Sequence, residues 1–437
     1  MTETIRARAQ ALLPELTAIR RDFHRFAEPG WMEMRTTSLL ARRLTDLGYE
    51  VLTGPAVCKA DARMGLPSAD ALEAHYKWAQ ENGADPEFLP VTRGGFTGVI
   101  ATLHCGEGPT VALRFDIDAL GVLEASDETH LPHREGFASV TPGVMHACGH
   151  DGHAAVGIGT AMLLRELRGQ LHGTVRLIFQ PAEEGVRGAS SVVAAGHLDG
   201  ADYALAAHVF PAGKAAGLVD IGVLKENGQG GLATSKLDVT FRGRSAHAGI
   251  APQEGRNALL AAATAVLNLH AIPRFGSTPT QLNVGTLHAG TGRNVICETA
   301  KLELEVRGQT TEANEYMLRR AQQIVKSAAE MQDCTVETQA MGHAAALTCD
   351  WTLSERVERV CKETLGLRVM RVGSLGGGSE DFSCMAQRVQ QQSGQAAYVG
   401  LLCACPAANH NDHFDFDEQA LANGAAMFTA VTASLLA

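Results

Sequence analysis

The chain has 437 residues, of which 45% are hydrophobic and 19% are charged, as in ordinary globular proteins. Its formal net charge of −11 disfavours nucleic acid as a partner, although it excludes no small ligand because a bound cation can invert a local field. The length exceeds one typical hydrophobic core, so two domains or one domain with an insertion are expected.

The N-terminal 25 residues are polar with periodic apolar positions, which predicts an amphipathic helix. This segment has no signal-peptide core, and no stretch of the sequence is apolar enough to predict a membrane span. The ten cysteines follow neither a disulfide rhythm nor paired Cys-x-x-Cys zinc spacing. We therefore expect reduced thiols in a cytoplasmic protein.

Short apolar runs alternate with helical stretches through the first 230 residues, which predicts an α/β sheet. Residues 110–114, 175–179 and 204–207 are expected to be buried strands, and each run ends where polar residues cluster. Residues 154–167 predict a buried helix. Residues 58–95 are richer in charge and contain an amphipathic stretch, so we expect a surface insertion near the site entrance.

The pattern changes after residue 232. Residues 236–241, 281–287, 301–307 and 335–340 predict half-exposed strands, and two helices are expected at 256–270 and 311–332. Together these elements predict a compact α+β domain inserted in the chain. The expected division is a catalytic domain formed by residues 1–232 and 343–437, with the inserted domain at 233–342.

Candidate metal ligands are concentrated in two motifs, MHACGHDGH at residues 145–153 and FQPAEEG at 179–185. Cys148, His150, His208 and His410 combine with adjacent Glu183 and Glu184 to offer thiolate, imidazole and carboxylate groups. Such a set suits Zn²⁺, Mn²⁺, Co²⁺ or Ni²⁺ rather than Mg²⁺ or Ca²⁺. One carboxylate can bind metal while its neighbour takes a proton from water, so a metal-dependent hydrolase is the leading hypothesis.

The whole chain resembles the aminoacylase/carboxypeptidase family of dinuclear metallohydrolases. Within it the match is to the Cys-Gly-His-Asp branch, which includes bacterial N-acyl-amino-acid amidohydrolases and plant auxin-conjugate hydrolases. The resemblance implies a metallopeptidase-like α/β catalytic domain, with a mixed sheet flanked by helices, and an inserted α+β lid or dimerisation domain. The supporting stretches are residues 20–24, 63–67, 94–98, 145–153, 179–185 and 414–418.

The resemblance implies two divalent metal ions in each copy of the chain, with Mn²⁺ favoured and Zn²⁺ as the other candidate. Their implied ligands are Cys148, His150, Glu184, His208 and His410, with Cys148 as the bridge. Glu183 is implied as the general base.

Two alternatives concern histidines and an aspartate near these ligands. His413 competes with His410, but the family ligand lies four residues before the phenylalanine that matches Phe414, which selects His410. Asp116 is expected either to orient the site or to form only an ion pair with Arg114.

In the inserted domain, the GRSAHAG loop at residues 243–249 resembles a family loop whose histidine stabilises the oxyanion in the active site of the partner copy. The resemblance therefore implies this role for His247, which otherwise would be an exposed turn residue. Asn283, Arg293 and Asn294 are implied as contacts of the substrate carboxylate. The GGGSED loop at 376–381 is implied to place Glu380 near the metals.

The implied reaction is hydrolysis of an N-acyl amino acid, with p-aminobenzoyl-glutamate expected first, indole-3-acetyl-aspartate as its closest rival, and a broad N-acyl-amino-acid range third. The resemblance also implies a homodimer, or a heterodimer with a homologous B subunit. The non-enzyme alternative is a partly regulatory member of such a heterodimer. The competent residues at all five ligand positions and at Glu183 argue against a degenerate scaffold.

Overall fold

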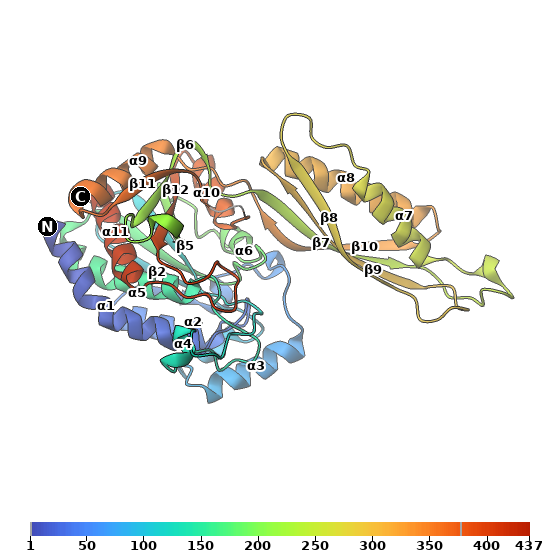
Figure 1. Cartoon of the computed structure of the whole chain (residues 1–437), viewed down its shortest axis with the longest axis horizontal. Coiled ribbons are helices and arrows are strands. Elements are labelled where there is room, and N and C mark those ends of the chain that lie inside the picture. Colours follow the sequence, from blue (N-terminus) through green and yellow to red (C-terminus); the bar gives the residue numbers. More distant parts are fainter. Residues whose placement is uncertain (1, 376–377) are drawn as a thin grey trace. The chain divides into compact units, whose positions relative to one another are not determined.

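The computed structural model describes residues 2–375 and 378–437, and its contacts divide the chain into two compact units (Figure 1). The larger unit comprises Met1–Gly231, Leu347–Gly377 and Asp381–Ala437. The smaller unit comprises Leu232–Ala346 and Gly378–Glu380. Among the described helices, none is both long and apolar enough to cross a membrane.

The larger unit is built on an eight-stranded mixed sheet in the order β1-β2-β4-β3-β5-β12-β6-β11. The central strands β4, β3, β5 and β12 are mutually parallel. The antiparallel pairs are β1 with β2, β2 with β4, and β6 with β12. The strand bounds are β1 Glu50–Thr53, β2 Val99–His104, β3 Thr110–Asp116, β4 Thr174–Gln180, β5 Tyr203–Pro211, β6 Ile221–Gln229, β11 Val369–Ser374 and β12 Gln395–Cys403. The expected mixed sheet flanked by helices is confirmed.

Three long helices, α1 (Thr2–Arg25), α5 (His150–Leu167) and α11 (Gln419–Leu436), pack against one another beside this sheet (Figure 1). Gly157 of α5 lets the helix approach the sheet, because a Cβ there would collide with the ring of Phe179. The other helices of the unit are α2 Met34–Asp46, α3 Ala69–Glu81, α4 Leu131–Arg134, α6 Ala189–Ala194, α9 Trp351–Arg359 and α10 Phe382–Gln391.

The segment at residues 58–95 contains α3, whose first turn is capped by the hydroxyl of Ser68. Leu72 and Tyr76 of α3 are buried together with Met34 of α2. The indole Nε1 of Trp31 donates a hydrogen bond to the carbonyl of Met64 (2.7 Å). The segment is therefore packed onto the larger unit by its own small apolar cluster.

The smaller unit is a four-stranded antiparallel sheet in the order β10-β7-β9-β8, with α7 and α8 on one face (Figure 1). Its elements are β7 Ala233–Arg242, α7 Ala258–His270, β8 Thr280–Ala289, β9 Thr299–Gly308, α8 Thr311–Glu330 and β10 Thr335–Ala344. Alternate residues of β9, including Leu302 and Leu304, are buried against the helices. β10 pairs with β7 as far as Ala344, within the segment Leu232–Ala346 of this unit.

Candidate metal centre

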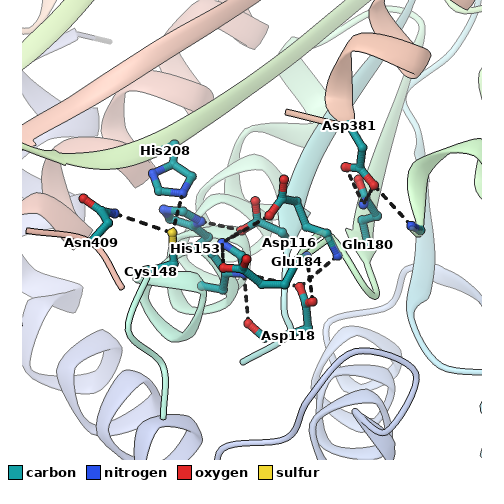
Figure 2. Close-up of polar contacts among 12 residues, drawn as sticks. Asp116, Asp118, Cys148, His153, Gln180, Glu184, His208, Asp381 and Asn409 are labelled. Carbon is teal, nitrogen blue, oxygen red and sulfur yellow. Dashed lines mark hydrogen bonds and ion pairs between the residues drawn. The ribbon is translucent and has the colours of Figure 1, made fainter. Parts of the chain in front are cut away.

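The candidate ligands of the larger unit lie around the carboxyl ends of its central parallel strands (Figure 2). β3 ends at Asp116, and β4 ends at Gln180, just before the Glu183–Glu184 pair. His208 lies within β5, opposite Gly400 of β12, and so does not follow the strand as the sequence pattern predicted. Carboxyl ends of parallel strands are where open α/β sheets form their sites.

Cys148 and His208 face each other, with 3.3 Å between Sγ and Nε2 (Figure 2). The Nδ1 atom of His208 lies 2.7 Å from the carbonyl of Val209, an arrangement that places the proton on Nδ1 and a lone pair on Nε2. The amide of Asn409 also donates to Sγ (3.5 Å). Burial and the Glu184 carboxylate raise the pKa of Cys148 to about 12, a shift that coordinated cations would reverse.

His150 presents a buried nitrogen toward the same space. Its Nδ1 atom lies 2.9 Å from the carbonyl of Asp118 and 3.3 Å from the carboxylate of that residue. Its Nε2 atom and Glu184 Oε1 are 3.9 Å apart, and within residues 2–375 and 378–437 neither buried atom has a hydrogen-bond partner. Two unsatisfied, inward-facing lone-pair donors fit a bound cation, because buried polar atoms rarely remain without a partner.

His410 adds a second imidazole beside Glu184, with 3.6 Å between Nε2 and Oε1. Its backbone has φ of 69°, a left-handed conformation, and its amide donates to the carbonyl of Ala147 (2.7 Å). The sets whose ligand atoms lie within 4.8 Å of one another include Cys148–His150–His208, Cys148–Glu184–His410 and His150–Glu183–Glu184. The structure therefore brings together all five predicted ligands and Glu183.

The Glu183–Glu184 turn is fixed by two carboxylates that the sequence interpretation did not single out. Asp118 accepts the backbone amides of Glu183 (3.0 Å) and Glu184 (2.9 Å), as Figure 2 shows. Glu33 accepts the amide of Ala182 (2.7 Å), whose φ of 53° is also left-handed. The pKa of Glu33 is raised to about 8 by burial and by the charge of Asp118. Asp118 thus holds both the turn and the His150 ring.

Asp116 forms the ion pair with Arg114 that was one of its two alternatives, and it also contacts His153. It accepts a hydrogen bond from Arg114 Nη1 (2.6 Å) and another from His153 Nδ1. The backbone amide of Val209 donates to His153 Nε2 (2.9 Å), so both ring nitrogens of His153 are occupied. His153 therefore has no lone pair left for a metal, whereas Asp116 Oδ1 lies 3.9 Å from His150 Nε2.

The alternative ligand His413 is engaged elsewhere. Its Nδ1 atom lies 2.8 Å from the Asp412 carboxylate, and its Nε2 atom lies 2.7 Å from Asp127. These two acidic neighbours raise the pKa of His413, which favours the imidazolium form. Both ring nitrogens of His413 are therefore occupied by carboxylates, away from the ligand cluster.

A buried ionic network links α1 to the residue that follows His150. Arg20 Nε donates to Asp151 (2.8 Å), and His24 lies between Asp151 (2.8 Å) and Glu124 (2.9 Å). Arg20 Nη2 also donates to Asp415 (2.7 Å), on the segment that follows His410. Although burial lowers the pKa of His24, the two carboxylates raise it to about 8.

In the smaller unit, three of the predicted contacts meet on adjoining loops. His247 pairs with Val295, and the amide of Ala248 donates to the carbonyl of Asn294 (3.0 Å). His247, Arg293 and Asn294 are all solvent-exposed. Asn283 instead lies on edge strand β8, six residues before its end at Ala289, or about 20 Å along an extended strand.

The GGGSED loop is described only from Gly378 onward. Gly376 and Gly377 lie outside the described residues. Glu380 is buried and belongs to the segment Gly378–Glu380, which groups with the smaller unit. Its predicted position near the metals stays a prediction.

Comparison with known protein families identifies the family to which this fold and ligand cluster belong. The profile of peptidase family M20/M25/M40 matches residues 112–434. The chain belongs to this family, which confirms the resemblance seen in its motifs, and it is a hydrolase of the amidohydrolase type.

Two relatives match the chain over nearly its full length. The chain is 45% identical to indole-3-acetyl-aspartic acid hydrolase of Enterobacter agglomerans, covering 94% of this chain and 93% of that protein. It is 44% identical to the A subunit of p-aminobenzoyl-glutamate hydrolase of Escherichia coli K12, covering 96% of this chain and 95% of the relative.

Two solved structures have the same fold over nearly the whole chain. The aminobenzoyl-glutamate utilization protein of Klebsiella pneumoniae is 38% identical with a TM-score of 0.82, and 98% and 97% of the two chains are covered. A dinuclear metal binding peptidase of Bacillus subtilis is 26% identical with a TM-score of 0.66, with 98% and 99% covered. Family membership and the ligand groups in this chain support a metal centre.

Proposed function

We propose that the chain hydrolyses N-acyl amino acids with an aromatic acyl group and an acidic amino acid, foremost p-aminobenzoyl-glutamate. The products are p-aminobenzoate and glutamate. The two relatives at 44% and 45% identity support this class, because both of their named substrates combine an aromatic acyl group with an acidic amino acid. Indole-3-acetyl-aspartate is the second candidate, and a broad range of N-acyl amino acids is the third.

The observation that carries the proposal is a pair of buried atoms, His150 Nε2 and Glu184 Oε1, neither of which has a hydrogen-bond partner within the described residues. With Cys148, His208 and His410 they form a donor set suited to two divalent ions, Mn²⁺ foremost and Zn²⁺ second. Two such ions, when bound, would supply Lewis-acid activation of the attacking water and of the scissile carbonyl.

In this mechanism Glu183 is the general base. Its carboxylate takes a proton from the attacking water and then delivers it to the leaving amide nitrogen. The anchoring of its backbone on Asp118 supports this role, because a proton acceptor acts efficiently only when its position is fixed. Asp118 positions the His150 ring, and Asp116 supports the adjoining His153.

The remaining site residues are proposed to bind the substrate. His247, presented by a second copy of the chain or by its homologue, donates to the oxyanion that develops on the scissile carbonyl. Arg293 and Asn294 bind the α-carboxylate, and Asn283 is a separate substrate contact farther along β8. Glu380 is proposed to support the metal ligands. His247, Arg293 and Asn294 are exposed on adjoining loops, which supports the proposal that all three contact the substrate.

The assembly is proposed to be a homodimer or a heterodimer with a homologous B subunit. The relatives from Escherichia coli and Haemophilus influenzae are named as the A subunit of a hydrolase and as its homologue, which supports a second chain. The mass of the purified assembly, measured by light scattering, separates a monomer from a dimer. A cytoplasmic location is also proposed and is supported by ten unbridged cysteines.

The test is release of p-aminobenzoate from p-aminobenzoyl-glutamate by the purified full chain, after metal removal and again after addition of Mn²⁺ or Zn²⁺. We expect turnover only with metal, and slower turnover of indole-3-acetyl-aspartate under the same conditions. Faster hydrolysis of the indole conjugate would reverse the order of the two substrates. No hydrolysis of either compound with metal bound would contradict a self-sufficient enzyme and favour the partly regulatory role.

A further inference from the structure

Arg187 lies directly after the Glu183–Glu184 turn and folds back over it. Its backbone amide donates to the carbonyl of Ala182 (3.1 Å), which closes the turn. Its guanidinium Nε donates to the carbonyl of Glu184 (2.8 Å), and Nη1 donates to the carbonyl of Gly65 (3.1 Å). The cation is therefore fixed on the backbone of a candidate metal ligand and also contacts the segment at residues 58–95.

Arg187 differs from the other arginines around the cluster in its lack of an acidic partner. Arg114 is buried and ion-paired with Asp116 (2.6 Å), and buried Arg20 is ion-paired with Asp151 (2.8 Å). Arg187 is half-buried, and within the described part of the chain no carboxylate lies within 4.0 Å of its guanidinium. Its two backbone contacts use two of five N–H donors, and Nη2 lies beside Gly30, where a Cβ would collide with it.

The surroundings determine which ligand such a cation suits. The carboxylates of Asp116, Asp118, Glu183 and Glu184 all lie in or beside the cluster. A fixed guanidinium beside these carboxylates adds a positive group with which a second substrate carboxylate can pair. The planar guanidinium binds a carboxylate through two parallel hydrogen bonds, a geometry that a neutral amide cannot satisfy equally.

We propose that Arg187 binds the side-chain carboxylate of the substrate's acidic amino acid and so determines specificity for that class. This inference rests on the proposed function and deepens it. Arg293 and Asn294 are the proposed contacts of the α-carboxylate, which leaves the side-chain carboxylate for a cation of the larger unit. The backbone anchors of Arg187 at Glu184 and Gly65 hold the guanidinium in place before substrate binds.

The inference also gives the segment at residues 58–95 a role. The carbonyl of Gly65 that receives Arg187 directly follows two residues that are themselves anchored, Arg63 and Met64. Trp31 Nε1 donates to the carbonyl of Met64 (2.7 Å), and Arg63 Nη1 donates to the carbonyl of Gly94 (2.8 Å). Trp31 is fully buried, so the loop is tied to the core of the unit. The segment thus positions the specificity cation from outside the metal cluster.

The test compares kcat/KM of the metal-loaded full chain for p-aminobenzoyl-glutamate and for p-aminobenzoyl-glutamine, whose side chain is neutral but similar in shape. In Arg187→Gln we expect the glutamate-to-glutamine ratio to fall about 10- to 100-fold, mainly through the glutamate substrate. Arg187→Lys keeps the positive charge but cannot form two parallel hydrogen bonds, so its glutamate-to-glutamine ratio should be intermediate. Arg93→Gln, an exposed arginine of the same segment that pairs with Glu73, is the control and should keep the wild-type ratio.

Three results would overturn the inference. If both Arg187 variants lost kcat/KM equally on the two substrates, Arg187 would only stabilise the Glu183–Glu184 turn. A wild-type chain that cleaves both substrates equally would remove acidic specificity, while the proposed amide hydrolysis would stand. A wild-type chain that cleaves neither substrate, and does not cleave indole-3-acetyl-aspartate, would overturn the proposed function together with the inference. Circular dichroism of each variant separates misfolding from lost substrate recognition. If Arg187→Gln does not fold, the glutamate-to-glutamine ratio of Arg187→Lys decides the test.

Discussion

The two units prepare their functional side chains in different ways. In the larger unit, His150 is completely buried and its ring is fixed by the carbonyl and carboxylate of Asp118. In the smaller unit, His247 and Arg293 are exposed on loops joined mainly through backbone contacts. The comparison indicates that the candidate ligands are positioned by contacts within one unit, whereas packing does not hold the exposed loop side chains, which agrees with the proposal that substrate or a second chain completes them.

The largest expected effect tests the proton acceptor of the buried cluster. Replacing Glu183 by glutamine should lower kcat by about 100- to 10,000-fold, because the amide cannot accept the proton from water. Metal content, measured by mass spectrometry of the acid-digested protein, should stay near the wild-type value. Unchanged turnover would remove Glu183 as the base, and lost metal would instead make it a ligand.

Replacing His247 by alanine tests the exposed loops. The loss of one oxyanion donor should lower kcat by about 100- to 1,000-fold, with metal content and folding unchanged. His288→Ala, at another exposed histidine of the smaller unit, is the matched control. If His247 were only a turn residue, both variants would have wild-type kinetics.

Replacing Asp118 by alanine tests the preorganisation of the larger unit. The His150 ring and the Glu183–Glu184 turn would lose a shared acceptor, so metal affinity should fall about 10- to 100-fold. Competition with a chromogenic chelator measures this affinity. Affinity equal to that of the wild type would show that Asp118 does not orient the ligands.

The smallest expected effect is on stability and concerns His24. Its folded-state pKa of about 8 exceeds the usual value of 6.5, so its contribution is complete below pH 6.5 and is lost as pH rises through 8. This contribution should reach about 2 kcal/mol at low pH. Urea unfolding of His24→Gln should therefore show a smaller drop in stability between pH 6 and 8.5 than the wild type.

The exposed His104→Gln variant serves as the control for this effect. It should keep the pH dependence of the wild type. An identical pH dependence in His24→Gln would mean that His24 does not carry a raised pKa in the folded chain.

The sequence contains the ligands but not the groups that orient them. Cys148 and His150 were predictable because they lie two residues apart in a motif at the start of a helix. Asp118 was missed because its contacts to His150, Glu183 and Glu184 join segments far apart in the sequence. No local pattern encodes such tertiary contacts.

Element boundaries near the site were displaced for a similar reason. α5 begins at His150, four residues before the predicted start, because Gly149 adopts φ of 87° and the polar motif forms the first helical turn. β5 extends through His208 because β12 pairs with it in parallel as far as Pro211. In both places tertiary packing overrides a polarity pattern that suggested a loop.

The most direct test of the account is a metal titration of the stripped chain, followed simultaneously by turnover of p-aminobenzoyl-glutamate and by bound metal. The account predicts that activity rises to a plateau at two ions per chain in the wild type. In Cys148→Ala, the loss of the proposed bridge should weaken both ions and lower the plateau. Full activity at no bound metal, or binding that is unchanged by Cys148→Ala, would contradict the dinuclear centre.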